Sequence, residues 1–255
     1  MVSMGFFDNW IRWKFERNGT IEILPYFYYD AAAFTAIYSA SSTKIRELLP
    51  RAEMNPVEVF PGRSLVAFTA FEYRRTDGIP YNEVSIAFLI TYERPQIPGL
   101  TISRMMMTRV YTTYVWQLPV TTEAARAGGV DLFGYPKFIA DIDFNEDGEW
   151  VTCSLVEHGQ EILQLSGKKL ASKRGKRTRY LSYNIEKGAP LIAEVLVSPK
   201  MFAQAMGGRS AKLELGSDHP VSDTLKQIRL SKLAILYQYI PTAELILFPA
   251  INMTD

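Results

Sequence analysis

Alternating apolar and polar residues, interrupted by short turns, occupy most of the chain. The segments "SLVAFTAFEYRR", "NEVSIAFLITYE" and "TISRMMMTRVYTTYVWQLP" are rich in the branched and aromatic residues that favour strands. Between them, "TDGIPY" and "RPQIPG" have the composition of turns. The same pattern predicts strands on both sides of Pro25, in "KFIADIDF" and "EWVTCSLVEHGQEILQLSG", in a later hairpin, and in "KLAILYQYIPTAELILFPA".

A few short segments have helical features instead. Capping residues, helix-stopping Gly or Pro, and apolar residues near helical spacing identify them. The predicted helices are Gly5 to Arg17, Ser41 to Leu49 with Ser42 or Thr43 as cap and Pro50 as stop, Thr121 to Ala127 with Thr122 as cap and Gly128 after the end, "SPKMFAQAMGG" with Ser198 as cap, and "HPVSDTLKQI". Many strands with few helices predict an antiparallel sheet closed into a barrel or packed as a sandwich.

Composition narrows the functional classes. The 255 residues are 47% hydrophobic and 22% charged, typical of a globular protein, and we expect one domain over residues 1–255. A single cysteine favours a reducing, cytoplasmic location, and no secretory signal or apolar run long enough to span a bilayer is evident. A net charge of +1 gives no reason to expect nucleic acid or a membrane as partner. The presence of only two histidines argues against a multi-histidine metal site and a histidine-based triad, and we expect no cofactor.

Lys137 is the first candidate for chemistry. It is the only lysine between Lys44 and Lys168 and stands in the apolar, aromatic segment "DLFGYPKFIA". A lysine that attacks a carbonyl carbon must be neutral, and burial or a neighbouring cation can bring this about. Strand alternation places Lys137 on the same face as Asp141 and Asp143, whereas Phe138 lies on the other face of the strand. The polar face that contains Lys137 is exposed to solvent in most sheets, but in a closed barrel it can line the lumen.

Several segments resemble the acetoacetate decarboxylase family. "GGVDLFGYPKFIADIDF" is similar to the family signature, in which an acidic position, here Asp131, precedes Tyr/Phe-Pro-Lys. "IYSASSTKIRELLPRAEMNPVEV", "GIPYNEVSIAF", "RYLSYNIEKGAPLIAEVLV" and "HPVSDTLKQIRLSKLAILYQYIPTAELIL" extend the resemblance, in order, from about Tyr28 to Phe248. It implies a mainly β, α+β fold: an antiparallel closed β-barrel with a few short flanking helices, to which residues 1–19 add an accessory aromatic helix. It also implies that Lys137 forms a Schiff base with a keto acid.

The sequence departs from the family pattern around this lysine. The decarboxylases have a second lysine where this chain has Phe138. The family's active-site arginine falls near Ala31, one of its glutamates at Thr69, and the other at Arg74 or Arg75. Glu83 is then the remaining acid/base candidate, with an exposed strand position as the alternative reading. Arg75 and Arg126 could bind a substrate carboxylate, and surface arginines without a ligand are the alternative. Tyr135 and Phe138 are the predicted pocket neighbours of Lys137.

Two other segments invite an interpretation. "KKLASKRGKRTR" contains seven basic residues, and a solvated hairpin loop is favoured over a nucleic-acid site because aromatic residues are missing from it. "SRMMMTR" is predicted to be strand core or a pocket wall. His219 is expected to organise the turn before the last helix.

Together these observations predict a carboxy-lyase similar to acetoacetate decarboxylase, acting on a keto acid through a Schiff base. Because the tuning residues differ, an aldolase or dehydratase acting on another keto acid is an alternative, and so is a non-catalytic small-molecule binder. The family tends to assemble, so we expect a homo-oligomer.

Overall fold

Seven strands close into a barrel at the centre of the protein. The computed structural model describes residues 5–17 and 19–253. Each barrel strand pairs with the next, and the pairing of the last strand with the first completes the ring. In order around the ring the strands are β7 (Tyr81–Tyr92), β8 (Val110–Gln117), β12 (Thr178–Glu186), β13 (Ala189–Met206), β15 (Leu236–Leu247), β3 (Tyr26–Ser41) and β6 (Arg63–Thr76). The prediction of a mainly β, closed barrel with short helices is confirmed.

The barrel is mixed and not purely antiparallel as predicted. Strands β8 and β12 run parallel, with Tyr180 opposite Tyr111, whereas the other barrel pairs are antiparallel. Parallel neighbours require a long crossover connection. Here residues 118–177 supply it, and they contain a helix and three strands of a second sheet.

Both faces of several barrel strands are buried, which explains their nearly continuous apolar character. On β7, Val84, Ile86 and Phe88 are fully buried on the outer face, while Glu83 and Ser85 point into the barrel. Successive side chains of a strand point to opposite faces. The even positions of β7 therefore build the core, and the odd positions line the lumen.

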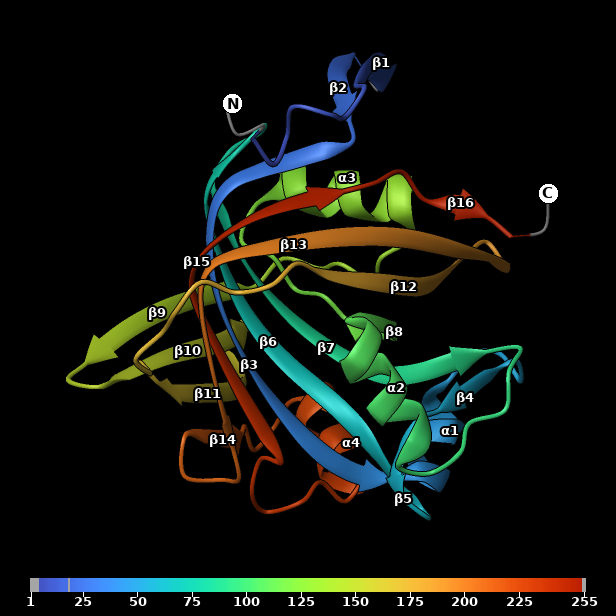
Figure 1. Ribbon diagram of the computed structural model, residues 1–255, viewed down its shortest axis with the longest axis vertical. Helices are drawn as coiled ribbons and strands as arrows, with labels where there is room; N and C mark the ends of the chain where they lie inside the picture. Colours follow the sequence, from blue (N-terminus) through green and yellow to red (C-terminus); the bar gives the residue numbers. More distant parts are fainter. Residues whose placement is uncertain (1–4, 18, 254–255) are drawn as a thin grey trace.

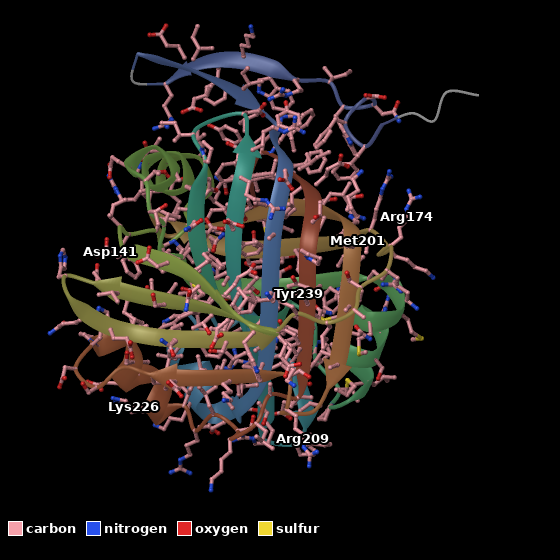
Figure 2. The ribbon with its side chains drawn as sticks, turned by 90° about the vertical axis from the view of Figure 1, so that its left-hand side faces the viewer. Asp141, Arg174, Met201, Arg209, Lys226 and Tyr239 are labelled. Atoms are coloured by element: carbon pink, nitrogen blue, oxygen red, sulfur yellow. The ribbon has the colours of Figure 1, made fainter. Side chains whose placement is uncertain are left out.

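A four-stranded sheet covers the outer face of β3, β6 and β7. Its order is β14–β11–β10–β9, and Figure 2 shows it crossing in front of the barrel strands. Cys153 and Leu155 of this sheet pack with Phe68 and Tyr237 of the barrel in the main hydrophobic core. The strands of this sheet are β9 (Asp141–Asp147), β10 (Trp150–Glu157), β11 (Gln160–Lys168) and β14 (Ala211–Leu215).

Helices lie at the ends of the barrel. Helix α3 covers the end from which the β1–β2 hairpin projects, and α2 lies toward the opposite end, near α1 and β5 (Figure 1). The helices are α1 (Ser42–Leu48), α2 (Leu100–Thr108), α3 (Glu123–Phe133) and α4 (Pro220–Gln227), and the short strands are β1 (Trp13–Arg17), β2 (Thr20–Leu24), β4 (Met54–Pro56), β5 (Glu58–Phe60) and β16 (Ile251–Asn252). In the described ranges, no helix has the length and apolar character needed to cross a membrane.

The predicted N-terminal aromatic helix is wrong over the residues that the structure describes. Strand β1 pairs with β2 from Trp13 opposite Leu24 to Arg17 opposite Thr20. Arg17 forms ion pairs with Glu22 and with Asp131. Cross-strand pairing with residues outside the helical pattern decides the conformation of this segment. Residues 1–4 and 18 of the predicted helix lie outside the described residues.

Two other segments have the opposite structure to the one predicted. Residues 101–108 form most of α2 and not a strand, since methionine, leucine and arginine are good helix formers and an apolar run alone does not distinguish the two structures. The predicted helix from Ser198 to Met206 is the end of β13, paired with β15. Register shifts at Pro199 and Met201 accommodate the proline.

Other boundaries differ in detail. Helix α3 does not end before Gly128 but continues to Phe133, and the side chain of Ser41, one residue earlier than predicted, caps α1. His219 caps α4, as expected for a residue that organises this turn. The basic run connects β11 of the outer sheet to β12 of the barrel and is not a hairpin, because these strands do not pair with each other.

The contact between Gly167 and Tyr237 joins the two sheets and gives a stability prediction. The Tyr237 hydroxyl donates a hydrogen bond to the Lys168 carbonyl oxygen at 2.9 Å, and a Cβ at Gly167 would overlap the Tyr237 ring. We expect Gly167→Ala to lower the free energy of unfolding by ~1–3 kcal/mol, measured by urea denaturation. Gly78→Ala is the control, because its Cβ would meet only the Thr76 hydroxyl, at 3.8 Å. Equal stability of the two variants would contradict this packing.

Candidate active site

The C-terminal end of α3 fixes the direction of the segment that contains Lys137. Gly134 adopts a left-handed conformation (φ 62°) that terminates the helix. Its N–H donates to the Val130 carbonyl oxygen at 3.1 Å, and the Tyr135 N–H donates to the Gly129 carbonyl oxygen at 3.1 Å. The chain therefore leaves α3 in a defined direction.

The segment after Pro136 is then held beside the first residues of β7. The Val120 N–H donates to the Phe138 carbonyl oxygen at 2.9 Å, and the Ala140 N–H donates to the Val120 carbonyl oxygen at 3.1 Å. Pro119, next to Val120, accepts a hydrogen bond from the Val84 N–H at 3.1 Å. Residues 118–120 thus connect the lysine segment to the strand that contains Glu83.

Lys137 and Glu83 form a buried ion pair. The lysine Nζ donates to Glu83 Oε2 at 2.6 Å, and the two side chains are only 6% and 8% exposed. The Tyr73 hydroxyl donates to the other carboxylate oxygen, Oε1, at 3.2 Å. Removing one partner of a buried pair leaves an uncompensated charge, which costs ~3–5 kcal/mol in proteins. The two residues therefore depend on each other.

Gly129 makes room for the lysine. A Cβ at this position would overlap Cδ and Cε of Lys137, whereas one at the adjacent Gly128 would meet only Arg17 and Tyr26, at 3.7 and 4.0 Å. The helix backbone thus forms part of the wall around the lysine side chain. A glycine inside a helix costs stability, and this close approach gives a physical reason for Gly129.

Four tyrosines surround the ion pair. The lysine Nζ lies 5.4 Å from the Tyr81 ring centroid and 6.0 Å from that of Tyr135. Burial, with the negative charge of Glu83 adding to it, raises the pKa of Tyr28, Tyr73, Tyr81 and Tyr135 above the usual tyrosine value. All four phenols therefore stay neutral and can act as hydrogen-bond donors at neutral pH.

The phenols also form hydrogen bonds among themselves and with the barrel wall. The Tyr28 and Tyr81 hydroxyls lie 3.2 Å apart, and the Tyr135 hydroxyl lies 2.7 Å from the Ser182 hydroxyl. One bond joins β3 to β7, and the other joins the segment after α3 to β12. The ion pair is consequently surrounded by ordered aromatic groups.

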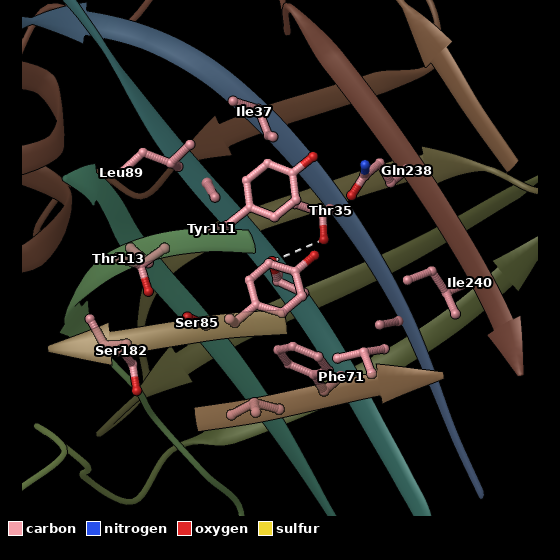
Figure 3. Close-up of a pocket in the computed structure, with 18 of the residues that line it drawn as sticks. Thr35, Ile37, Phe71, Ser85, Leu89, Tyr111, Thr113, Ser182, Gln238 and Ile240 are labelled. Atoms are coloured by element: carbon pink, nitrogen blue, oxygen red, sulfur yellow. Dashed lines mark hydrogen bonds between the residues drawn. The ribbon is translucent and has the colours of Figure 1, made fainter. Parts of the chain in front are cut away.

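The side chains of Lys137 and Glu83 line a cavity of about 300 Å³ inside the barrel. In the described part of the chain, these two are the only charged residues that line it. The remaining lining is mostly aliphatic and aromatic, with a few hydroxyl and amide groups. Figure 3 shows residues from several strands that surround this space, among them Thr35, Ile37, Leu89, Tyr111, Thr113, Ser182, Gln238 and Ile240.

The structure brings together only some of the predicted site residues. Tyr135 lines the cavity with Lys137 and Glu83. Phe138 points the other way and packs against the main core. Arg126 is at the surface, where it pairs with Glu123, and Arg75 is exposed, with its guanidinium 5.4 Å from the Tyr29 ring centroid. Neither arginine lines the cavity, so no carboxylate-binding role is assigned to them.

The positions expected from the family resemblance are also located. Ala31 and Thr69 line the cavity, so the expected arginine and one glutamate are replaced within it. Arg74 lies outside the cavity and pairs with Asp30 and Glu72. Glu83 therefore supplies the carboxylate of this site.

Sequence reasoning missed Gly129, Ser182 and the tyrosines at 28, 73 and 81. One of them, Tyr81, follows a recoverable pattern, because it lies two residues before Glu83 and so shares its face of β7. Gly129 could not be found in this way, since its role depends on a contact with a residue beyond the end of its own helix. Tyr28 and Ser182 reach the site only because the barrel closes.

Other reactive groups lie away from this cavity. Burial raises the pKa of the Cys153 thiol, which is in the main core. His219 is held by Glu157, with Nε2 2.9 Å from Oε2. Residues 5–17 and 19–253 contain no group of three or more His, Cys, Asp or Glu side chains placed to hold a metal ion.

The fold is thus a closed barrel whose lumen contains a buried lysine–carboxylate pair on the wall of a cavity. The family model for acetoacetate decarboxylase matches residues 14–244, and the chain therefore belongs to the acetoacetate decarboxylase family. Comparison with curated protein sequences finds no match.

Solved structures have the same fold at low sequence identity. One, described as acetoacetate decarboxylase, is 16% identical, with 90% of this chain and 89% of that chain covered and a TM-score of 0.61. Acetoacetate decarboxylase from Legionella pneumophila subsp. pneumophila str. Philadelphia 1 is 13% identical, with coverages of 91% and 89% and a TM-score of 0.63. The enduracididine biosynthesis enzyme MppR complexed with pyruvate is 13% identical, with coverages of 91% and 91% and a TM-score of 0.63. At these identities the likeness shows the fold.

The buried tyrosines predict how stability changes at alkaline pH. A phenol that keeps its proton in the folded protein loses it at about pH 10 once the chain unfolds. The free energy of unfolding should therefore fall as the pH rises above about 10. Chemical denaturation at a series of pH values checks this, and Tyr81→Phe should give a shallower slope because one such phenol is removed. The same slope in both proteins would contradict the raised pKa of Tyr81.

Proposed function

We propose that the protein is an enzyme that binds a keto acid in the barrel lumen and forms a Schiff base between its carbonyl carbon and Lys137. The observation that carries this proposal is the Lys137–Glu83 pair, buried together in a cavity with no other charged lining residue among those described. Membership of the acetoacetate decarboxylase family supports a reaction of this kind.

The pair supplies a route to the reactive amine. Transfer of one proton from Lys137 Nζ to Glu83 across the 2.6 Å hydrogen bond gives a neutral amine and a neutral carboxylic acid. The amine attacks the substrate carbonyl carbon and forms a carbinolamine. The proton held by Glu83 then leaves with the hydroxyl oxygen as water, and a positively charged iminium remains on Lys137.

The surroundings of the iminium favour loss of carbon dioxide from a 3-keto acid. Once the iminium has formed, its own charge is the only positive one among the described lining residues, and the Glu83 carboxylate and the apolar lining both disfavour a second carboxylate in the cavity. As carbon dioxide leaves, the electron pair of the broken carbon–carbon bond moves toward the iminium and an enamine forms. Protonation of the enamine and addition of water release the ketone and restore the lysine.

A second outcome is carbon–carbon bond formation. Glu83, as carboxylate, could remove a proton next to the iminium, and the resulting enamine could attack a second carbonyl compound and then lose water. MppR, which has a similar fold, has been solved with pyruvate and with the condensation product of pyruvate and imidazole 4-carboxaldehyde. The replacements at Ala31 and Thr69 leave room for such a change of reaction.

Reductive trapping tests the proposed nucleophile. Incubation with 2- and 3-keto acids and borohydride should add the mass of the reduced substrate to Lys137, located by peptide mass spectrometry. Lys137→Arg keeps a cation but cannot form an imine, so its adduct should be lost. Glu83→Gln cannot accept the proton, and its adduct should form about 10²–10⁴-fold more slowly. The released products separate decarboxylation from condensation. If no keto acid forms an adduct, the proposal of a Schiff-base enzyme is overturned and a non-catalytic binder is the remaining alternative.

The two adjacent glycines of α3 give a matched test of lysine placement. The Cβ of Gly129→Ala would displace the Lys137 side chain, and a displacement of about 1 Å can reduce a rate about 100-fold. Gly128→Ala should keep a rate close to that of the unchanged protein, because its Cβ makes only ordinary contacts. The measurement is the rate of trapped adduct formation, with thermal melting as a check on folding. Similar rates in both variants would show that this helix wall does not position the lysine.

A further inference from the structure

The cavity lining changes in character along the barrel, row by row. Because paired residues of neighbouring strands lie side by side, the strand register groups the lining side chains into rows. The first row contains Glu83 and is otherwise apolar: Glu83, Phe71, Ala33 and Ile240. The second row is entirely polar: Ser85, Thr69, Thr35 and Gln238. The third row is entirely apolar: Ala87, Ala67, Ile37 and Leu236.

The polar row has free hydrogen-bonding capacity. Thr35 and Thr69 are 3.0 Å apart and bond to each other, as the dashed line in Figure 3 marks. The side chains of Ser85 and Gln238 stand in the same row, and within the described residues neither has a recorded hydrogen-bond partner. A serine hydroxyl and a glutamine amide can both donate to an oxygen atom. Ligand pockets typically combine an apolar lining with a few polar groups of this kind.

Beyond the third row the cavity lining toward α2 is mostly apolar, with Thr113 beside Leu89 and the Tyr111 hydroxyl as its polar groups. Leu65 and Leu89 line this end, and Ile102 and the 46% exposed Met106 of α2 and Ile235 border it. Rows two residues apart on a strand are separated by about 7 Å. The apolar row therefore lies roughly 13 Å from the row of Glu83. A short keto acid bound to Lys137 would leave this end of the cavity unfilled.

The volume agrees with a longer ligand. A cavity of about 300 Å³ has room for about ten groups of the size of a water molecule, each of which occupies about 30 Å³. The charge distribution also favours a ligand with one polar end, because the only charged residues in the described lining are Lys137 and Glu83. A ligand would match all three rows if it had a polar end at Lys137, one oxygen atom further along its carbon chain, and an apolar terminus.

We infer that the substrate is an amphiphilic carbonyl compound: its reactive carbonyl lies at Lys137, an oxygen atom about 7 Å away lies at the polar row, and an aliphatic end lies between the apolar row and α2. This inference rests on the proposed Schiff base and adds the substrate class. Each methylene group that enters the apolar end should tighten binding, by up to about fourfold.

A chain-length series tests the apolar end. Straight-chain 2-oxo acids of increasing length are trapped on Lys137 with cyanoborohydride, and the half-saturating concentration is measured for each. It should fall with each added carbon until about ten groups fill the cavity, and then rise. An ether oxygen about 7 Å from the carbonyl should lower it further, and Gln238→Leu should reduce that gain.

Three variants separate a specific effect from general hydrophobicity. Ala67→Leu fills the apolar row and should reduce the ratio between long and short acids. Met106→Lys places a charge on the cavity lining of α2 and should do the same, whereas Met107→Lys on the adjacent, 77% exposed residue should leave the ratio unchanged. Thermal melting confirms that each variant folds.

The results distinguish this inference from the proposed function. If no oxo acid of any length forms an adduct on Lys137, the Schiff-base enzyme itself is wrong. If short and long acids form adducts with the same half-saturating concentration, the Schiff base stands and the amphiphilic substrate is wrong. If length matters but the ether oxygen gives no gain, the assignment of the polar row is overturned.

Discussion

The buried ion pair between Lys137 and Glu83 is the interaction on which the rest of the site depends. Two opposite charges have been removed from water, and each is tolerated only because the other lies 2.6 Å away. Three separate pieces of structure must cooperate to achieve this: β7 presents the carboxylate, the turn after α3 presents the ammonium, and Gly129 leaves space for the lysine chain. Because the pair costs stability unless it is complete, an arrangement that serves only the fold would not require it. Its place on the wall of the cavity is the observation on which the proposed chemistry rests.

The closed barrel makes this arrangement possible by giving one strand two buried faces. Even positions of β7 belong to the core shared with the outer sheet, and odd positions face the lumen. Closure also brings Tyr28, Tyr135 and Ser182, which are distant in sequence, to the same layer. The outer sheet keeps water from the other side of β3, β6 and β7, so the polar groups of the lumen are surrounded by apolar packing.

Much of the barrel could be predicted from the sequence, because β3, β6, β7 and β15 have strand patterns that their tertiary environment reinforces. The alternation around Lys137 was also informative: Phe138, Ala140 and Ile142 share the core face as predicted. The opposite face could not be assigned from the pattern. Lys137 points into the lumen, whereas Ile139 is exposed and Asp141, also exposed, begins β9 of the outer sheet.

The failures have a common cause, which is that long-range contacts decided the structure of weakly patterned segments. The Ser-Pro start at 198 is typical of a helix, but pairing with β15 extends β13 through it. The carboxylate-binding role of Arg75 and Arg126 stays a prediction, and both side chains lie away from the cavity. Their position depends on which way a strand and a helix face once the barrel has closed.

The separation of the two faces of β7 has a consequence for how such a protein can change. Odd-numbered residues can be exchanged to fit a different ligand while the even-numbered ones continue to hold the molecule together. A displacement of the strand by one residue, in contrast, would exchange the two sets and put the Glu83 carboxylate into the core. Selection can therefore explore new chemistry through single substitutions in the lumen, but the alignment of the strands itself is not open to variation.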